Sequence, residues 1–489
     1  MLASRRSFLM GAAALSAAVV TPETVRAMAA MQASADWSLA TADLEGDVAR
    51  RVMRRVHGRA LAGLEGALFR NGPGKFRRPG GSATHWFDGD GLMRAFRVRD
   101  GQATLEARFA DTPKWRWETE IDAVVTPGFG TVGDASRARI GSPDDANAAN
   151  TAVLVAGDEV WALWESGSPL AMDRSDLSSK RFVTLRDDLK GMPFQAHPRY
   201  DPDGTIWNIG LWGDRMVVWR LNADRSLNNA QIVALPRASY MHDFTATARH
   251  LVIVLQPWVF DNQGMPFASR FAWKPEMGTQ VLVIDKADLS RTRTFELPAF
   301  SYFHLGDAWE DGSGTIRFDV AAGKDVTFAM EGARVLVEGR GTVPGEPAEL
   351  SLVTLHTDGR AEMVSSGVAA EFPKSDPRRA GLARRYTVHV AGERAGRPLP
   401  TGLAVHDGET GRSDAFDFGD GVIMEEANWV PKPGRSGERD AWLVAPAINL
   451  REGVTELHAF DAARVADGPV ASWRANIALP AGFHGIWAG

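Results

Sequence analysis

Four histidines occur in distinctive local sequences that suit ligands of a metal ion. They stand in the segments QAHPRYDP, YMHDF, YFHLGDAWED and AGFHGIWAG, at His197, His242, His304 and His484. Their separations of 45, 62 and 180 residues are too long for one helix or hairpin to bring them together. If they meet, they meet at the centre of a fold that returns repeatedly to one axis. Four neutral imidazoles suit iron, copper, nickel or zinc.

The composition narrows the classes of site that the chain can form. The 489 residues include no cysteine, so disulfides, thiolate zinc sites, iron–sulfur clusters and cysteine nucleophiles are excluded. A metal site must therefore use His, Asp and Glu. The net charge of −6 and the lack of a basic stripe argue against a nucleic-acid partner. The 16 Trp against 4 Tyr indicate a strongly apolar set of aromatic side chains.

The first residues resemble an export signal of the twin-arginine type. Arg5 and Arg6 precede Ser7 and an apolar run that is too short to span a membrane, and Ala27-Met28-Ala29 follows as a small-x-small cleavage site. We expect residues 1–29 to be a signal peptide that uses the Tat export machinery. The mature protein is then periplasmic or exported, and it is cytoplasmic if the signal is not used.

The rest of the chain has the pattern of an all-β protein. Short runs of β-branched and aromatic residues alternate with Asp-Gly and other turn sequences, as in 152–166, 204–222, 250–257, 279–285, 349–357, 440–449 and 455–461. A closed β-propeller of six to eight blades accommodates so many hairpins without exposed sheet edges. We expect one catalytic domain over residues 40–489. The segment 47–63 is predicted to form a short helix before the first blade.

Several sequence blocks, in a consistent order, resemble the carotenoid cleavage oxygenases, a family that includes apocarotenoid oxygenases, lignostilbene dioxygenases and a retinoid isomerase. The resemblance runs from about residue 60 to the C-terminus. Besides the four histidine segments, its blocks are LEGALFRNGPG (64–74), HWFDGDGLMRAFRV (85–98), ALWESGSP (162–169), GMPFASRFAWKPEMGTQVLVID (264–285), AEFPKSD (370–376) and EANWVPKPG (426–434).

The resemblance implies a fold and a metal centre. The fold is a seven-bladed β-propeller with one Fe(II) on its central axis and a cap of loops and short helices over one face. The four histidines named above match the iron ligands of the family, and three glutamates match the carboxylates that hydrogen-bond three of those ligands: Glu165, Glu371 and Glu426. Such carboxylates orient imidazole ligands and offset the charge of a buried dication. One departure is Asp307-Ala308, where the family usually has Asn-Ala; Asp307 either alters a hydrogen bond near His304 or lies in a loop.

The function implied by the resemblance is double-bond cleavage by a non-haem Fe(II) dioxygenase, with O₂ as co-substrate. A carotenoid or apocarotenoid, cleaved to two carbonyl products, is the first choice of substrate. A stilbene or related phenylpropanoid is the alternative, followed by a polyene isomerase and a non-catalytic binding propeller. No catalytic acid or base is expected beyond the metal centre, because the protein's main task is to position the alkene.

The segment 256–273 is rich in aromatic residues and has two interpretations. It is either an inter-blade loop packed on its own rings, or the mouth of a substrate tunnel that also contacts a membrane surface. In the second case the tunnel residues are Trp258, Phe260, Phe267 and Phe271. A phenolic substrate would need a cation or base near its oxygen, and Lys114 is the candidate for that role.

Other motifs are interpreted as structural. Seven histidines lie outside the four histidine segments and are not expected to bind metal: His57, His85, His250, His356, His389, His406 and His458. The DGDG sequence at 88–91 lacks the ligand spacing of a calcium loop. The NGPG sequence at 71–74 has no Lys-Ser/Thr after it, so it is not a phosphate loop.

Overall fold

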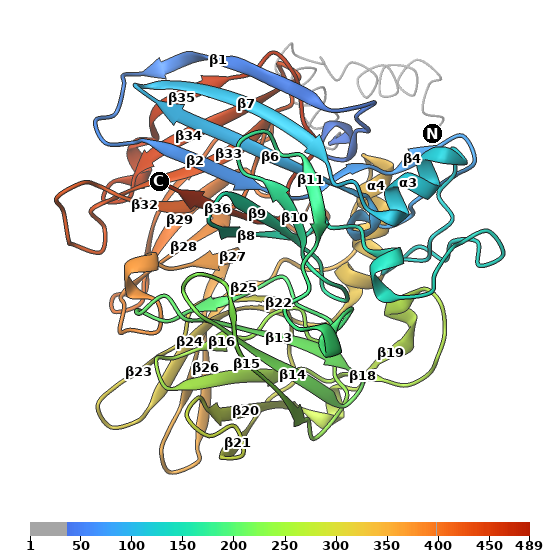
Figure 1. The fold of residues 1–489 in the computed structure, drawn as a ribbon. Coiled ribbons are helices and arrows are strands. Elements are labelled where there is room, and N and C mark those ends of the chain that lie inside the picture. Colours follow the sequence, from blue (N-terminus) through green and yellow to red (C-terminus); the bar gives the residue numbers. More distant parts are fainter. Residues whose placement is uncertain (1–36, 398) are drawn as a thin grey trace, which may run out of the picture.

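The computed structural model describes residues 37–397 and 399–489 and shows an all-β, propeller-like arrangement of sheets (Figure 1). Successive sheets follow one another around the molecule. The predicted fold class is confirmed at this level. The predicted twin-arginine signal lies outside the described residues. Among the described helices, none has the length and apolar character needed to cross a membrane.

Five separate antiparallel sheets of four or five strands make up the middle of the chain. The first contains β8 (Ala152–Ala156), β9 (Glu159–Leu163), β10 (Leu170–Asp173) and β11 (Ser179–Phe182). The second contains β12 (Arg199–Tyr200), β13 (Ile206–Trp212), β14 (Arg215–Leu221) and β15 (Leu227–Ala234). The third contains β16 (Thr245–Ala246), β17 (His250–Leu255), β20 (Thr279–Asp285) and β21 (Thr292–Leu297). The fourth contains β22 (Ser301–Leu305), β23 (Trp309–Glu310), β24 (Ile316–Gly323), β25 (Glu349–Leu355) and β26 (Ala361–Ala369). The fifth contains β27 (Glu371–Lys374), β28 (Tyr386–Ala391), β29 (Gly402–Asp407) and β30 (Arg412–Asp417).

The two ends of the chain share one eleven-stranded sheet. Its C-terminal part contains β31 (Val422–Met424), β32 (Asn428–Pro431), β33 (Ala441–Asn449), β34 (Val454–Asp461) and β35 (Pro469–Arg474). Its other part contains β1 (Val48–Gly58), β7 (Gln102–Phe109), β6 (Asp90–Arg99), β3 (Pro73–Lys75), β2 (Gly66–Arg70) and the last strand, β36 (Gly485–Ala488).

The prediction of seven separate blades is wrong, because five sheets are separate and the remaining strands form one sheet. The long strand β1 causes this. Its first half pairs with β7 and its second half with β35, so hydrogen bonds run without a break between the N-terminal and C-terminal strands. The two parts of this sheet also pack on one another through Leu68, Phe96, Leu457 and Trp473.

The expected helix over 47–63 is wrong as well, since most of it is β1. Val48, Val52 and Val56 repeat every four residues, which fits a helix face but also fits one face of a strand. Valine is β-branched and favours strands. The strand bridges the edges of β7 and β35, and each half of it forms backbone hydrogen bonds with one of them.

The apolar core lies between neighbouring sheets. Ile209 and Val218 of the second sheet pack on Leu251 and Ile253 of the third. Val252 and Val283 of the third sheet pack in turn on residues of the fourth, such as Phe318. Similar clusters join the first and second sheets and the fifth sheet and β33. Because each sheet is buried against the next, the inner edges of different sheets are held in fixed relation.

Short helices and two hairpins lie in the connections. One hairpin is β4 (Arg77–Arg78) with β5 (Gly81–Ser82). The longer helical segments are α3 (Pro113–Glu120), the π-helical turn η7 (Phe328–Gly332) and α4 (Ala333–Glu338), and the other hairpin is β18 (Trp258–Phe260) with β19 (Phe271–Trp273). Figure 1 shows α3, α4 and this hairpin on the same side of the sheets. The hairpin packs on η7 through Trp258, Ala268 and Ala329.

Candidate metal centre

The four predicted histidines converge on one point. Each offers a ring nitrogen, and these atoms all lie within 4.8 Å of one another. The Nε2 atoms of His197 and His242 are 3.0 Å apart, and those of His304 and His484 are 3.1 Å apart. His304 lies in β22, and the others directly precede strands at sheet edges: His197 comes before β12, His242 before β16 and His484 before β36.

The spacing of the nitrogens fits a single metal ion. Imidazole nitrogens bind metals at about 2.0–2.1 Å, so two neighbouring ligands at right angles lie about 3.0 Å apart. The two printed Nε2–Nε2 separations match that value. His304 and His484 each donate their Nδ1–H to a carboxylate, so in the neutral form both Nε2 atoms carry lone pairs and cannot hydrogen-bond each other across the 3.1 Å gap. The donor set therefore fits a His-only metal centre.

Each of the three predicted glutamates contacts a different histidine through Nδ1. Glu165 pairs with His242, Glu371 with His304 at 2.5 Å, and Glu426 with His484 at 2.9 Å. The Nδ1–H donates to the carboxylate, which fixes the tautomer and leaves Nε2 free to bind a metal. His197 has no such carboxylate partner among the described residues.

The surroundings keep two of the rings neutral. Burial is the main cause that lowers the pKa of His197 and of His484 well below the usual value, and the neighbouring imidazoles add to it. The pKa of His242 is raised: burial acts to lower it, but the charge and hydrogen bond of Glu165 outweigh burial. Neutral imidazole is the form that binds metal.

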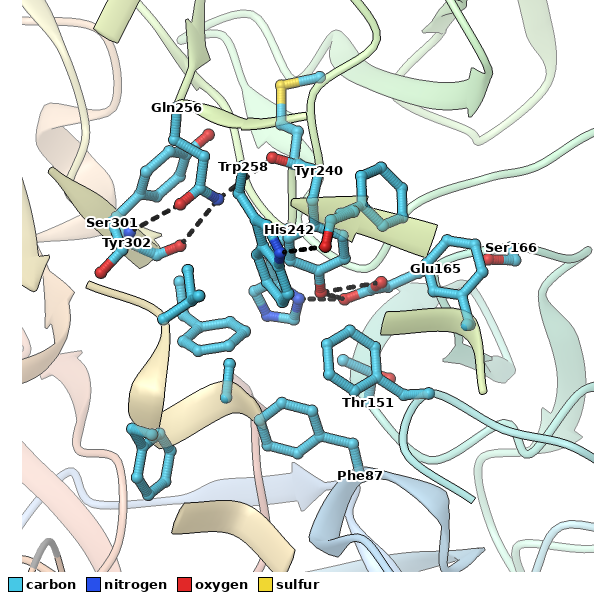
Figure 2. Close-up of a pocket in the computed structure, with 18 of the residues that line it drawn as sticks. Phe87, Thr151, Glu165, Ser166, Tyr240, His242, Gln256, Trp258, Ser301 and Tyr302 are labelled. Atoms are coloured by element: carbon cyan, nitrogen blue, oxygen red, sulfur yellow. Dashed lines mark hydrogen bonds and ion pairs between the residues drawn. The ribbon is translucent and has the colours of Figure 1, made fainter. Parts of the chain in front are cut away.

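Tyr240 holds Glu165 in place, and Figure 2 shows the two side chains together with His242. The Tyr240 hydroxyl donates to both carboxylate oxygens, at 3.0 and 3.2 Å. Burial and then the charge of Glu165 raise the pKa of Tyr240 well above its usual value, so the phenol keeps its proton and remains a donor. Sequence reasoning missed Tyr240, although it stands two residues before His242.

A cationic pair supports Glu426 on the opposite side of the centre. Lys374 lies 3.0 Å from its carboxylate, and the buried Arg70 lies 3.4 Å away. The backbone N–H of Gly485, next to His484, also donates to Glu426 at 2.8 Å. Arg70 further pairs with Glu425. No local sequence signal identifies Arg70, because it comes from β2, more than 350 residues away from Glu426.

Asp307 lies in the loop after β22 and does not contact His304 directly. It accepts hydrogen bonds from Arg199 at 3.0 Å and from Ser375. Arg199 also bonds the buried Asp243, so it links the segments after His197, His242 and His304. Burial acts to raise the pKa of Asp307, but the Arg199 charge and the Ser375 hydrogen bond lower it overall. The departure from Asn thus creates an ion pair beside the centre.

The centre opens into a cavity of about 820 Å³. His242, His304 and His484 line it, together with Glu165 and Glu371. Aromatic side chains are prominent in the rest of the wall, among them Trp86, Phe87, Phe129, Trp164, Tyr240, Trp258, Phe303, Phe372 and Phe483. Phe372 stacks on His304 with ring centres 4.6 Å apart, and the edge of Phe303 meets His242 at 5.4 Å. Two rings of the candidate metal site are thus also packed against the cavity wall.

The sequence of the whole β-rich region matches one protein family. The sequence model of the retinal pigment epithelial membrane protein family matches residues 42–489. The chain belongs to this family, the carotenoid cleavage oxygenases.

Relatives in the family are named as oxygenases of different substrates. Resveratrol cleavage oxygenase 1 of Aspergillus fumigatus is 25% identical over 482 residues, which cover 91% of this chain and 93% of the relative. Apocarotenoid-15,15'-oxygenase of Synechocystis is 25% identical over 457 residues, with 88% and 92% covered. Lignostilbene-alpha,beta-dioxygenase isozyme III of Sphingomonas paucimobilis is 25% identical over 490 residues, with 91% and 94% covered.

A solved structure of the family has the same fold. The cobalt-substituted Synechocystis apocarotenoid oxygenase superposes with a TM-score of 0.82 at 23% identity, covering 93% of this chain and 98% of that one.

The predicted tunnel residues of the aromatic segment all line the cavity: Trp258, Phe260, Phe267 and Phe271. Lys114 does not. It lies in α3, buried, with its ammonium 2.6 Å from Asp90 and 2.8 Å from Glu118. The prediction that Lys114 contacts a phenolic substrate is therefore wrong, because two carboxylates already bind its charge in the protein interior.

The other histidines stay outside the metal-ligand group, as expected. Both ring nitrogens of His85 have hydrogen-bond partners. Its Nε2 bonds the Ala329 carbonyl at 2.8 Å, and its Nδ1 accepts from the Phe87 N–H at 3.2 Å. Among the described residues, the four predicted histidines form the whole group.

Proposed function

We propose that the protein is a non-haem Fe(II) dioxygenase that cleaves a carbon–carbon double bond of a carotenoid or apocarotenoid into two carbonyl products. The observation that carries the proposal is the four-histidine cluster, with three rings held by carboxylates, at the wall of an aromatic cavity. One iron ion per chain would be held by His197, His242, His304 and His484 at the axis of the ring of sheets. When bound, Fe(II) supplies the site at which O₂ is activated.

The residues of this chain hold the substrate and keep water away. An extended polyene presents almost only apolar surface, and each buried methylene contributes about 0.8 kcal/mol. Phe87, Phe129 and Phe303 form a connected set of edge-on contacts beside His242. We propose that this set holds the alkene next to the metal, and that η7, α4 and the β18–β19 hairpin form the cap over this face.

A stilbene is the second candidate, because two of the similar enzymes are named for resveratrol and lignostilbene. A phenol needs a hydrogen-bond partner. The buried Gln195 Oε1 and Ser239 Oγ line the cavity and have no partner among the described residues. Arg270 is the only cationic side chain in the described lining, and it already donates to the Gly264 carbonyl. The polyene is favoured because the wall offers far more apolar area than polar groups.

One experiment separates these functions. Iron-loaded protein is incubated under oxygen with an apocarotenal and, separately, with a hydroxystilbene, and the products are identified by mass spectrometry. We expect two carbonyl fragments from the apocarotenal. A rearranged but uncleaved polyene indicates an isomerase, cleavage of the hydroxystilbene alone indicates the phenylpropanoid function, and binding without turnover indicates a binding propeller.

We further propose that the protein is exported through the twin-arginine route, on the basis of Arg5, Arg6 and the sequence that follows them. Replacing both arginines with lysine keeps the charge but should leave the precursor in the cytoplasm. Cell fractionation with an antibody to the mature region measures this. Mature protein outside the cytoplasm from the double variant contradicts the proposal.

We also propose a peripheral contact with a membrane surface near the cavity. Phe260 and Met265 are 39% and 41% exposed, and both line the cavity mouth in the 256–273 segment. An apolar substrate would then pass from lipid to the cavity without crossing water. Co-sedimentation with phosphatidylcholine vesicles tests this: replacing both residues with serine should weaken binding, and unchanged binding contradicts it.

A further inference from the structure

One carboxyl group in the cavity is not explained by the metal centre. Glu393 follows β28 and lines the cavity on the wall that also contains Leu399 and Pro400. Three residues earlier, Val390 pairs with Glu371 across the β27–β28 ladder, so Glu393 lies near the His304 side of the centre. It does not contact any of the four histidines through a hydrogen bond or ion pair.

Other enclosed acids of the cavity have partners. Glu165 accepts from His242 and Tyr240, Glu371 accepts from His304, and Asp88 accepts from three backbone N–H groups of the 129–131 turn. The described residues give the Glu393 side chain neither a hydrogen bond nor an ion pair. Glu393 is half-buried and lines an apolar cavity, so its unpaired carboxyl group can meet a hydrogen-bonding partner that comes with the substrate.

The surroundings of Glu393 set its protonation state and so the kind of ligand group that it can bind. Burial, with the charge of Glu371 as the second cause, raises the pKa of the Glu393 carboxyl well above its usual range. A carboxylic acid that keeps its proton is both an O–H donor and a carbonyl acceptor. It can therefore bond a hydroxyl or a carbonyl oxygen.

A substrate carboxylate does not fit this wall. Asp325 and Glu346 line the same cavity, and the only described cation in the lining, Arg270, lies in the aromatic segment and is bonded to Gly264. An anionic end group would meet acidic side chains without a counter-charge. The partner is thus a neutral oxygen function.

We propose that Glu393 forms a polar subsite that hydrogen-bonds a neutral oxygen-bearing end of the substrate, a hydroxyl or carbonyl group, and so sets the register of the chain relative to the metal. This rests on the proposed function, because the long part of the substrate must lie along the aromatic wall. The aromatic wall supplies most of the burial, and Glu393 supplies a directional contact.

The test uses two apocarotenals that differ only in a 3-hydroxyl group on the end ring. Wild type, Glu393→Leu and Glu393→Gln are compared on both. One hydrogen bond contributes about 0.5–1.5 kcal/mol, which is about a 2- to 13-fold change. We expect Glu393→Leu to raise KM for the hydroxylated substrate by such a factor, with little change in kcat and little change for the substrate without the hydroxyl. Glu393→Gln should keep most of the preference, because an amide both donates and accepts.

Two controls separate failure of the subsite from failure of the fold or of the proposed function. Glu409→Gln changes an exposed acid in the β29–β30 turn of the same sheet and should leave KM and kcat unchanged for both substrates. Iron content and the thermal midpoint should be the same in all variants.

Calorimetric binding of 3-hydroxy-β-ionone against β-ionone gives a readout without turnover, and Glu393→Leu should remove the preference for the hydroxylated ligand. If the leucine variant keeps the wild-type preference in binding and in KM, the subsite is rejected, even where cleavage itself is observed. If wild type cleaves neither polyene but the binding preference depends on Glu393, the proposed function fails and the subsite stands.

Discussion

The support of Glu165 by Tyr240 gives a prediction whose size follows from the structure. Tyr240→Phe removes one hydroxyl that donates to both oxygens of the carboxylate, at 3.0 and 3.2 Å. The ring itself stays, with its packing on Trp258 at 4.7 Å and on Phe129 at 5.5 Å between ring centres. A hydrogen bond to a charged group contributes about 1.5–3 kcal/mol. Glu165 keeps its bond to His242, so we expect the loss of iron-binding free energy to lie at the lower end of that range. This corresponds to a loss of about tenfold in iron affinity.

The assay is competition for Fe(II) against a chelator of known affinity under anaerobic conditions, with the thermal midpoint measured in parallel. Tyr386→Phe is the matched control, because Tyr386 begins β28 and lies outside the cavity lining. It should leave iron affinity unchanged. An iron affinity of Tyr240→Phe within twofold of wild type, with His242→Ala losing iron in the same assay, would refute the reasoning that Glu165 needs this donor.

Three further predictions concern the centre and its surroundings. Glu371→Gln should lower iron affinity or cleavage rate by about 10- to 100-fold, because the amide cannot replace the charged acceptor of His304; iron analysis and initial rates check this. Lys114→Met should lower the free energy of unfolding by about 1–3 kcal/mol in urea denaturation, since Asp90 and Glu118 lose their ammonium partner and keep only Arg78 as a counter-charge, and it should not change the ratio of polyene to stilbene cleavage. Iron affinity should fall as the pH is lowered from 8 to 6. The pKa of His242 is raised, so the fraction of protonated His242, which cannot bind metal through Nε2, increases as the pH falls through that pKa. An iron affinity that is constant over this interval contradicts the prediction.

The residues of the metal centre were predictable from the sequence because each stands in its own recognisable segment. The sequence singled out His197, His242, His304 and His484 in this way, and the structure brings their ring nitrogens within 4.8 Å of one another. The three glutamates were found because they occur in matched blocks, and each forms a hydrogen bond with a different histidine of the cluster.

The supporting residues were not predictable, because their roles arise from long-range packing. Arg70 reaches Glu426 from β2, and Arg199 joins Asp243 to Asp307 across two sheets. Lys114 was misassigned for the same reason: a lysine in a Trp-rich segment gives no sign that Asp90 and Glu118 will enclose it.

The fold class followed from the alternation of strands and turns, but the number of separate blades did not. Strand pairing between the two ends of the chain depends on where β1 lies in space. Its Arg-rich sequence has Val at every fourth position; this spacing fits a helix face while β-branched valine favours a strand, so the segment carries two opposing signals. The four-residue spacing therefore favoured the wrong element.

The most direct test of the central claim is the turnover of an apocarotenal by iron-loaded protein, with the products identified by mass spectrometry and the iron content measured on the same sample. The account predicts one iron per chain and two carbonyl products whose carbon atoms add up to those of the substrate, with both iron and products lost in His304→Ala. Cleavage that is equal in iron-free protein, or iron-loaded protein that returns the polyene uncleaved, would contradict it.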